Sequence, residues 1–323
     1  MQKTLLILIL LQFGGVLMAQ PPISIEANAT TKTLLRSDRV EEISVCYSAD
    51  GGTLYYARDG AIFNFGKANA ADIWQSDLGG IDQSWQEPVN MGPQLNTSEE
   101  ESIISASGDG NSLYFTRKEQ GSLVLYKTLK SGRKWSIPKP VSLPESSELL
   151  EIGHYFISAD EQIMLLSGRT LNQPNGSLFF ALKQGSNLWS EPRRLFLAGS
   201  QELEVKSAFL ASDNRSLYFS TSSLGGYGAN DLFVSRRLGR GWYNWSSPEN
   251  LGPEINTPAD EYGLSMPIEG RKIAYLSNVK KGEIKIFTGE LPISLEPALE
   301  SKVGQLSSAD KEEIILKKSI KNK

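Results

Sequence analysis

The sequence contains a single cysteine and a single histidine in 323 residues. One cysteine cannot form an intramolecular disulfide, so the fold must depend on its core. Cys46 lies in the apolar run 43–47, which favours a buried thiol over a nucleophile. His154 has no second histidine as a metal-binding partner, and no Walker loop, zinc-type cysteine pattern or EF-hand loop occurs. We expect a structural role for His154, no metal and no cofactor.

The sequence also lacks a large excess of one charge: it contains 33 Lys and Arg and 37 Asp and Glu, which gives a net charge of −4. Nucleic-acid-binding proteins carry a basic patch, so this class of partner is excluded. Long apolar runs are confined to the N-terminus, where residues 5–11 contain no polar residue. This run is shorter than the roughly 20 residues of a membrane span. We predict a signal peptide over 1–19 that is cleaved after Ala19, with export of a soluble protein to the periplasm or the extracellular space and no membrane span after cleavage.

A turn motif of the form Ser-x-Asp-Gly-x-x-Leu-Tyr-Phe repeats with a period of about 50 residues. Asp and Ser side chains bond to backbone N–H groups one or two residues further on, and Gly or Asn supplies the positive φ of a hairpin turn. The apolar and aromatic residues that follow restart a strand. The motif covers residues 48–56, 107–115 and 212–219, with weaker copies at 158–165 and 268–275, and its acidic residues are Asp50, Asp109, Asp160, Asp213 and Glu269.

A second element, Trp-x-x-Pro, follows the turn motif in register. Its tryptophans are Trp85, Trp135, Trp189 and Trp245. Each unit thus offers about four short strands that cannot bury both faces of a sheet alone, whereas radial stacking of four-stranded sheets solves this problem. The pattern predicts an all-β protein, a β-propeller of five four-stranded blades, with six left open. A pair of β-sandwiches would not explain four Trp-x-x-Pro copies in register.

The five predicted units cover residues 42–97, 98–148, 149–203, 204–258 and 259–290. The last unit lacks Trp-x-x-Pro, so we expect residues 23–36 to supply its outer strand. The propeller is expected to occupy residues 20–292. Residues 293–323 form a charged tail that is either a short capped helix or disordered.

These motifs, together with a Gly-Gly-x-Gly-x-x-Asp-Leu-Phe stretch (225–233) and two Asn-x-Gly-Pro-x-x-Asn-Thr connectors (90–97 and 250–257), resemble the WD40-like, TolB-type β-propeller repeat (PD40). The version in this chain is most similar to the propeller part of exported OmpA-family proteins of Bacteroidetes-type bacteria. The resemblance covers about residues 42–290. The 293–323 tail is too short for an OmpA domain, so we do not carry over peptidoglycan anchoring.

An acidic residue precedes each turn aspartate by eight or nine positions, at the predicted start of the innermost strand. These candidates for the channel mouth are Glu42, Glu101, Glu151, Glu204 and Glu261, with Asp260 as an alternative to the last. Five carboxylates around one mouth would attract a cation or a basic segment. The other interpretation, which we favour, is that each accepts hydrogen bonds from the backbone or from a neighbouring blade.

No non-repeating polar cluster marks a catalytic site, so we expect no enzyme activity and no catalytic residues. The predicted function is binding or scaffolding of a protein or envelope component, with specificity in loops such as 59–70 and 221–230. The alternative is a sialidase-like glycoside hydrolase, because residues 48–52 resemble an Asp-box, although Leu54-Tyr55 follows where an Asp-box has Thr-Trp. Hydrolysis would need two carboxylates across one bond. A purely structural assembly component is a third hypothesis; the partner and the oligomeric state are left open.

Overall fold

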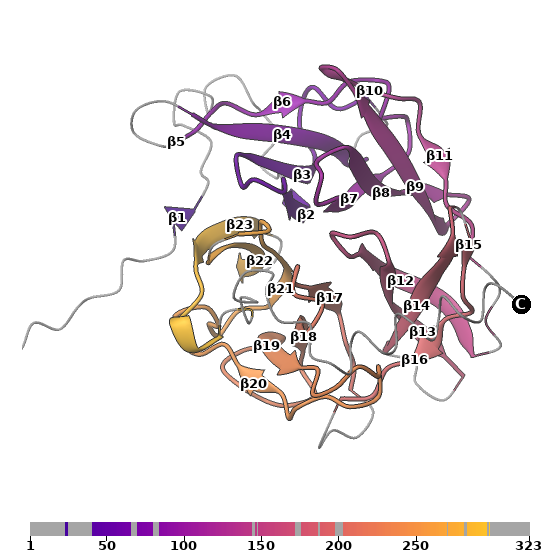
Figure 1. Cartoon of the computed structure of the whole chain (residues 1–323). Helices are drawn as coiled ribbons and strands as arrows, with labels where there is room; N and C mark the ends of the chain where they lie inside the picture. Colours follow the sequence, from indigo (N-terminus) through magenta and orange to yellow (C-terminus); the bar gives the residue numbers. More distant parts are fainter. Residues whose placement is uncertain are drawn as a thin grey trace, which may run out of the picture.

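The computed structural model describes residues 23–24, 41–65, 70–79, 84–143, 146, 148–171, 176–186, 188–197, 203–269, 271–280, 283–295 and 297. Their strands form five sheets arranged radially around one axis, as Figure 1 shows. The predicted five-bladed β-propeller is therefore confirmed. The predicted signal peptide and nearly all of the C-terminal tail lie outside the described residues. No helix in the described part of the chain meets the length and apolarity that a membrane span requires.

Each sheet is one blade of antiparallel strands that follow one another from the axis outwards. Blade 1 contains β2 (Glu41–Tyr47), β3 (Thr53–Asp59), β4 (Asp72–Gly79), β5 (Ser84–Trp85) and β6 (Val89–Asn90). Blade 2 contains β7 (Glu101–Ala106), β8 (Ser112–Glu119), β9 (Ser122–Ser131), β10 (Lys134–Trp135) and β11 (Lys139–Pro140). Blade 3 contains β12 (Leu149–Ile157), β13 (Ile163–Thr170), β14 (Ser177–Gly185), β15 (Leu188–Trp189) and β16 (Arg193–Arg194). Blade 4 contains β17 (Ser207–Leu210), β18 (Ser216–Thr221), β19 (Asp231–Arg236) and β20 (Glu249–Asn250).

Blade 5 joins the two ends of the described chain. It contains β21 (Glu261–Ser265), β22 (Lys272–Lys280) and β23 (Glu283–Glu290), and its outer strand is β1 (Ile23–Ser24). Ile23 pairs with Thr288 in an antiparallel register. The predicted closure by the N-terminal segment is thus confirmed for these two residues, and 25–36 lie outside the described part. Closing the circle in this way pairs the outer edge of β23, which would otherwise be an open sheet edge.

The repeated turns form because one aspartate side chain binds the turn that follows it. In blade 2, Asp109 Oδ1 accepts hydrogen bonds from Ser107 Oγ at 2.5 Å and from the Asn111 N–H at 2.9 Å. Asp50 and Asp160 accept the equivalent pair of bonds in blades 1 and 3. In blade 4 the place of the turn serine is taken by Ala211; Asp213 keeps the bond from the N–H two residues further on, that of Arg215, and also accepts bonds from the N–H and Oγ of Ser216.

We expect the substitution Asp109→Ala to lower the free energy of unfolding by about 1 kcal/mol, because three hydrogen bonds that define the turn are lost while the site stays in contact with water. Asp109→Asn keeps an acceptor oxygen and should cost less. Urea denaturation of both variants checks this. Equal midpoints for wild type and Asp109→Ala would show that the turn forms without its aspartate.

The core consists of five clusters, each lying between two neighbouring blades. Cluster members alternate between the facing sides of adjacent sheets, as in the cluster of Phe156 and Phe180 from blade 3 with Phe219 and Phe233 from blade 4. The tryptophans of the second motif fill these boundaries: Trp189 and Trp245 are buried, and Trp135 meets Tyr55 of blade 1 edge-on. The motif repeats because every blade must cover the face of its neighbour.

Candidate functional site

A cavity of about 330 Å³ lies on the propeller axis, at the end where the innermost strands begin. Four of the five innermost strands carry a bulge there, and the bulged residues Ile43, Ile104, Gly153 and Gly263 all line the cavity. A bulge redirects a side chain that regular pairing would place on the sheet. The walls are therefore mainly apolar, and Val45, Ile103, Phe156, Ala208 and Leu264 complete them.

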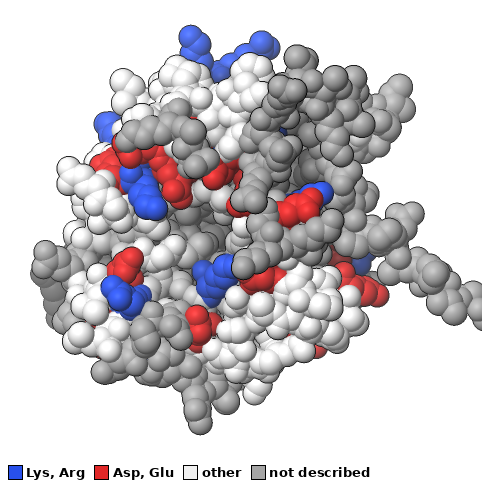
Figure 2. Space-filling model, turned by 180° about the vertical axis from the view of Figure 1, so that it is seen from behind, with Lys and Arg blue, Asp and Glu red and all other residues white. Residues whose placement is uncertain are grey.

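Charged groups at the mouth of the axial cavity are paired with one another. Lys206 Nζ lies 2.6 Å from Asp260 Oδ2 and 3.5 Å from the centre of the Tyr262 ring. Glu100 lies 3.6 Å from Lys118 Nζ. Figure 2 shows a hollow near the middle of one face, with acidic and basic side chains of mixed sign around it. Among the residues described at the mouth, these pairs leave no excess of one charge that would select a simple ion.

His154 lines the axial cavity and is partly buried. It stands four residues before Ser158, at the repeat position that Ser44 and Ser207 hold before their own turns. Those serines accept hydrogen bonds from N–H groups of the next blade, at Ile103 and Gly263. The Nδ1 atom of His154 is buried and has no hydrogen-bond partner among the described residues. Burial lowers the pKa of His154 to about 4, so the ring is neutral at pH 7.

The five predicted mouth carboxylates do not share one environment. Glu101 and Glu261 are fully buried. Each accepts bonds from the N–H and Oγ1 of a threonine, Thr97 or Thr257, which ends a repeated connector. Glu101 also pairs with Arg117 Nε at 2.7 Å, and Glu261 accepts a bond from Ser277. Burial raises the pKa of Glu101, against the opposing effect of its bonds from Thr97 and Arg117.

The remaining predicted carboxylates lie elsewhere. Glu151 is exposed and pairs with the equally exposed Arg169 at 2.9 Å. Glu204 is half-buried, and its N–H donates to Ser223 Oγ. The side chain of Glu42 lies outside the described residues. Among the residues that the structure describes, no group of three or more His, Cys, Asp and Glu is placed to hold a metal ion.

The two loops expected to carry specificity follow the second strand of their blades, at the same end as the axial cavity. Between β3 and β4, Ile62, Phe63 and Phe65 are 50%, 71% and 45% exposed. Between β18 and β19, Leu224 and Tyr227 are 38% and 48% exposed, and Asn230 Nδ2 donates to Asp260 Oδ1 at the cavity mouth. Exposed apolar side chains on the face that carries a cavity are typical of a binding surface.

The opposite end of the axis is nearly closed by the turns themselves. Gly108 N–H donates to the Ala159 carbonyl at 2.7 Å, and Ile268 N–H donates to the Ala49 carbonyl at 3.0 Å. A Cβ on Gly108 would lie 2.9 Å from the Ile268 side chain, so only glycine fits at this position without a shift. Only about 30 Å³ of space remains between the turns, and the axial cavity therefore opens toward one face.

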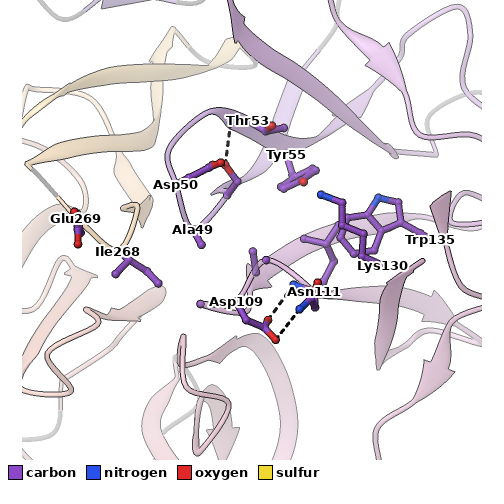
Figure 3. A pocket seen from close by; sticks show the side chains of 15 residues that line it. Ala49, Asp50, Thr53, Tyr55, Asp109, Asn111, Lys130, Trp135, Ile268 and Glu269 are labelled. Atoms are coloured by element: carbon purple, nitrogen blue, oxygen red, sulfur yellow. Dashed lines mark hydrogen bonds between the residues drawn. The ribbon is translucent and has the colours of Figure 1, made fainter. Parts of the chain in front are cut away.

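A second pocket of about 610 Å³ lies at this closed end, between blades 1 and 2 (Figure 3). Asp50 and Tyr55 come from blade 1, and Asp109, Lys130 and Trp135 come from blade 2. The repeat pattern identified Asp50, Asp109 and Trp135 as structural residues and did not predict that they line a pocket. The signal that could have found it is Gly110, the residue at which this boundary departs from the next one.

No protein-family model and no curated protein sequence matches the chain. Solved structures do. An endo-arabinase from Bacteroides thetaiotaomicron is 12% identical, with 80% of this chain and 96% of that one covered and a TM-score of 0.50. A protein described as a glycoside hydrolase is 10% identical, with coverage of 83% and 90% and a TM-score of 0.51.

TolB from Acinetobacter baumannii is 13% identical, with a TM-score of 0.44; the match covers 77% of this chain and 55% of TolB. At such identities the likeness concerns the fold alone. The two matches with TM-scores of 0.50 and 0.51 agree with the β-propeller fold of this chain.

Proposed function

We propose that the protein is an exported, non-catalytic binding module that holds a segment of a protein partner at the mouth of the axial cavity. The observation that carries this proposal is the cavity itself. Its volume of about 330 Å³ accommodates a large side chain, its walls are mainly apolar, and the charges around its mouth are paired locally. An anchor side chain buried in such a pocket is the usual energetic centre of a protein–protein contact. The apolar side chains of the two loops extend the surface on the same face.

The chemistry of the lining supports binding over proton transfer. His154 is neutral at pH 7, and its low pKa makes it a weak base. Glu100 and Asp260 are each paired with a lysine at the cavity mouth. Export is part of the proposal and is supported by the N-terminal sequence; fractionation of cells should then find the mature protein outside the cytoplasm.

The proposal is tested with a substitution that fills the axial cavity. Gly153 lines the cavity, and a Cβ at this position would meet nothing closer than the Ser167 carbonyl at 3.9 Å. Gly153→Leu should therefore occupy the space without disturbing the blade. Gly289→Leu, in the outer part of blade 5 with nothing within 4 Å of the added Cβ, is the matched control. We expect one protein from an envelope extract to be retained by wild type and Gly289→Leu and lost with Gly153→Leu.

A panel of glycoside substrates, run beside the capture, tests the enzyme alternative. The proposal expects no turnover. Hydrolysis that is abolished by Glu100→Gln or Asp260→Asn would contradict it and would identify a glycoside hydrolase.

A further inference from the structure

The pocket between blades 1 and 2 contains polar groups without partners. The Tyr55 side chain is only 7% exposed, yet its hydroxyl makes no hydrogen bond to any described residue. Lys130 Nζ lies 5.8 Å from the centre of the Trp135 ring and forms no ion pair within the same set of residues. Both groups line the pocket, where a ligand that supplies an acceptor can bond to them.

The boundary between blades 2 and 3 presents the same residue types in the same repeat positions. Tyr114 corresponds to Tyr55, because each follows its turn aspartate by five residues. Lys183 corresponds to Lys130, because each pairs across the outer strands with the tryptophan of its blade and lies near its ring.

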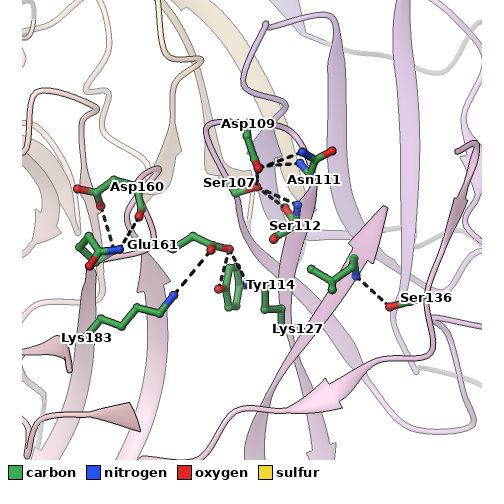
Figure 4. Close-up of polar contacts among 12 residues, drawn as sticks. Ser107, Asp109, Asn111, Ser112, Tyr114, Lys127, Ser136, Asp160, Glu161 and Lys183 are labelled. Carbon is green, nitrogen blue, oxygen red and sulfur yellow. Dashed lines mark hydrogen bonds and ion pairs between the residues drawn. The ribbon is translucent and has the colours of Figure 1, made fainter. Parts of the chain in front are cut away.

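At that second boundary every one of these groups has a partner (Figure 4). Glu161 Oε1 accepts a hydrogen bond from the Tyr114 hydroxyl at 2.9 Å and lies 2.8 Å from Lys127 Nζ. Its other oxygen lies 3.8 Å from Lys183 Nζ. A single carboxylate therefore satisfies one phenol and two ammonium groups.

The two boundaries differ at two side chains. Glu161 directly follows the turn aspartate of blade 3, and Gly110 directly follows that of blade 2. Both backbones are left-handed, with φ of 57° and 69°. The residue paired with the tyrosine on the next strand also differs: it is Gln75 for Tyr55 and Lys127 for Tyr114. The pocket between blades 1 and 2 is the space that a carboxylate occupies one blade further on.

We propose that this pocket binds an acidic side chain of a polypeptide partner, whose carboxylate takes the place that Glu161 holds at the next boundary. The carboxylate accepts a hydrogen bond from the Tyr55 hydroxyl and pairs with Lys130, beside the ring of Trp135. Asp50 and Asp109 hold their turns with carboxylate oxygens and, like Glu269, line the pocket as acceptors. Backbone N–H groups of a peptide would satisfy these acceptors, which a bare anion could not do.

This site lies at the opposite end of the propeller from the axial cavity, so it does not depend on the function proposed for that cavity. The probe is a fluorescently labelled decaglutamate peptide, with decaglutamine as its uncharged match, followed by anisotropy at low ionic strength. The net charge of the protein is −4, which disfavours unspecific binding of the acidic probe. We expect decaglutamate to bind and decaglutamine not to bind.

The decisive variant is Gly110→Glu, which supplies the missing carboxylate from within the chain. Nothing lies within 4 Å of the added Cβ, and Glu161 shows that glutamate adopts this backbone conformation. We expect a loss of affinity of about tenfold or more, as for loss of a charge-assisted bond. Gly121→Glu is the control: it adds the same charge at a left-handed glycine with equal space, at the far end of blade 2.

Two further variants test the groups that bind the carboxylate. Tyr55→Phe removes only the hydroxyl and should weaken decaglutamate binding. Glu161→Gly should open a second site between blades 2 and 3, which binds more tightly because Lys127 is present there as well. The proposal is overturned if Gly110→Glu binds the probe as wild type does, or if decaglutamine binds equally well. Binding of oligogalacturonate in place of decaglutamate would also overturn it and would assign the pocket to sugar acids.

Discussion

Replacing Glu101 by alanine is expected to lower the free energy of unfolding by about 3 kcal/mol, since removing one partner of a buried ion pair leaves the other charge poorly compensated. Glu101 is completely buried and accepts bonds from Thr97 and Arg117. Arg117 is itself mostly buried, and it would lose the closer of its two carboxylate partners and keep only Glu119 at 3.9 Å. Chemical denaturation followed by tryptophan fluorescence measures the loss.

The control is Glu151→Ala, because Glu151 is the predicted mouth carboxylate of blade 3 and stands one residue further from its turn than Glu101 does. Its carboxylate is exposed and pairs with an exposed arginine, Arg169. Such surface pairs contribute about 0 to 1 kcal/mol, so this variant should unfold almost like wild type. A comparable loss in both variants would mean that the position in the repeat matters more than burial and partners.

The second large effect is a loss of stability in mild acid that depends on His154. In the unfolded chain a histidine has a pKa near 6.5, whereas burial lowers the pKa of folded His154 to about 4. Between these values the unfolded state binds more protons than the folded state does. The contribution of His154 to the free energy of unfolding is therefore fully present above pH 6.5 and is lost as the pH drops toward 4. We expect a loss of about 2 kcal/mol between pH 7 and pH 5 from this group.

His154→Ser is the matched variant, because serine stands at this repeat position in blades 1 and 4. It should abolish the part of the pH dependence that lies between pH 5 and 7. Since the chain has one histidine, its imidazole signals can be followed directly by NMR. Titration of those signals near pH 6.5, or an unchanged pH dependence in the variant, would show that the ring is solvated.

The fold could be predicted because its information is local and repeated. The Asp turns bond within seven residues of sequence, and each tryptophan covers a neighbouring sheet that the same pattern generates. Five copies of one unit admit few arrangements that bury every sheet face. The missing outer strand of blade 5 pointed to closure by the N-terminal segment for the same reason.

The environment of the five carboxylates was only partly predictable. Glu101 and Glu261 follow the two repeated connectors whose final threonines bind them, and that signal is present in the sequence. The arginine that pairs with Glu101 and the exposure of Glu151 depend on how neighbouring strands lie. The spacing suggested one set of five, but Glu101 and Glu261 stand eight residues before the turn residue and Glu151 stands nine, and a shift of one residue along a strand turns the side chain to the other face.

The blades and their turns follow from the amino-acid sequence alone, because they depend on contacts within a unit that repeats; the sequence favoured five blades over six, and the structure has five. The empty spaces in the molecule follow only from how the blades pack in three dimensions. The axial cavity exists because bulges in four separate strands meet on one axis. The pocket beside Tyr55 exists because Gly110, more than fifty residues away in the chain, has no side chain to fill it. Both depend on distances between blades, which no single repeat encodes.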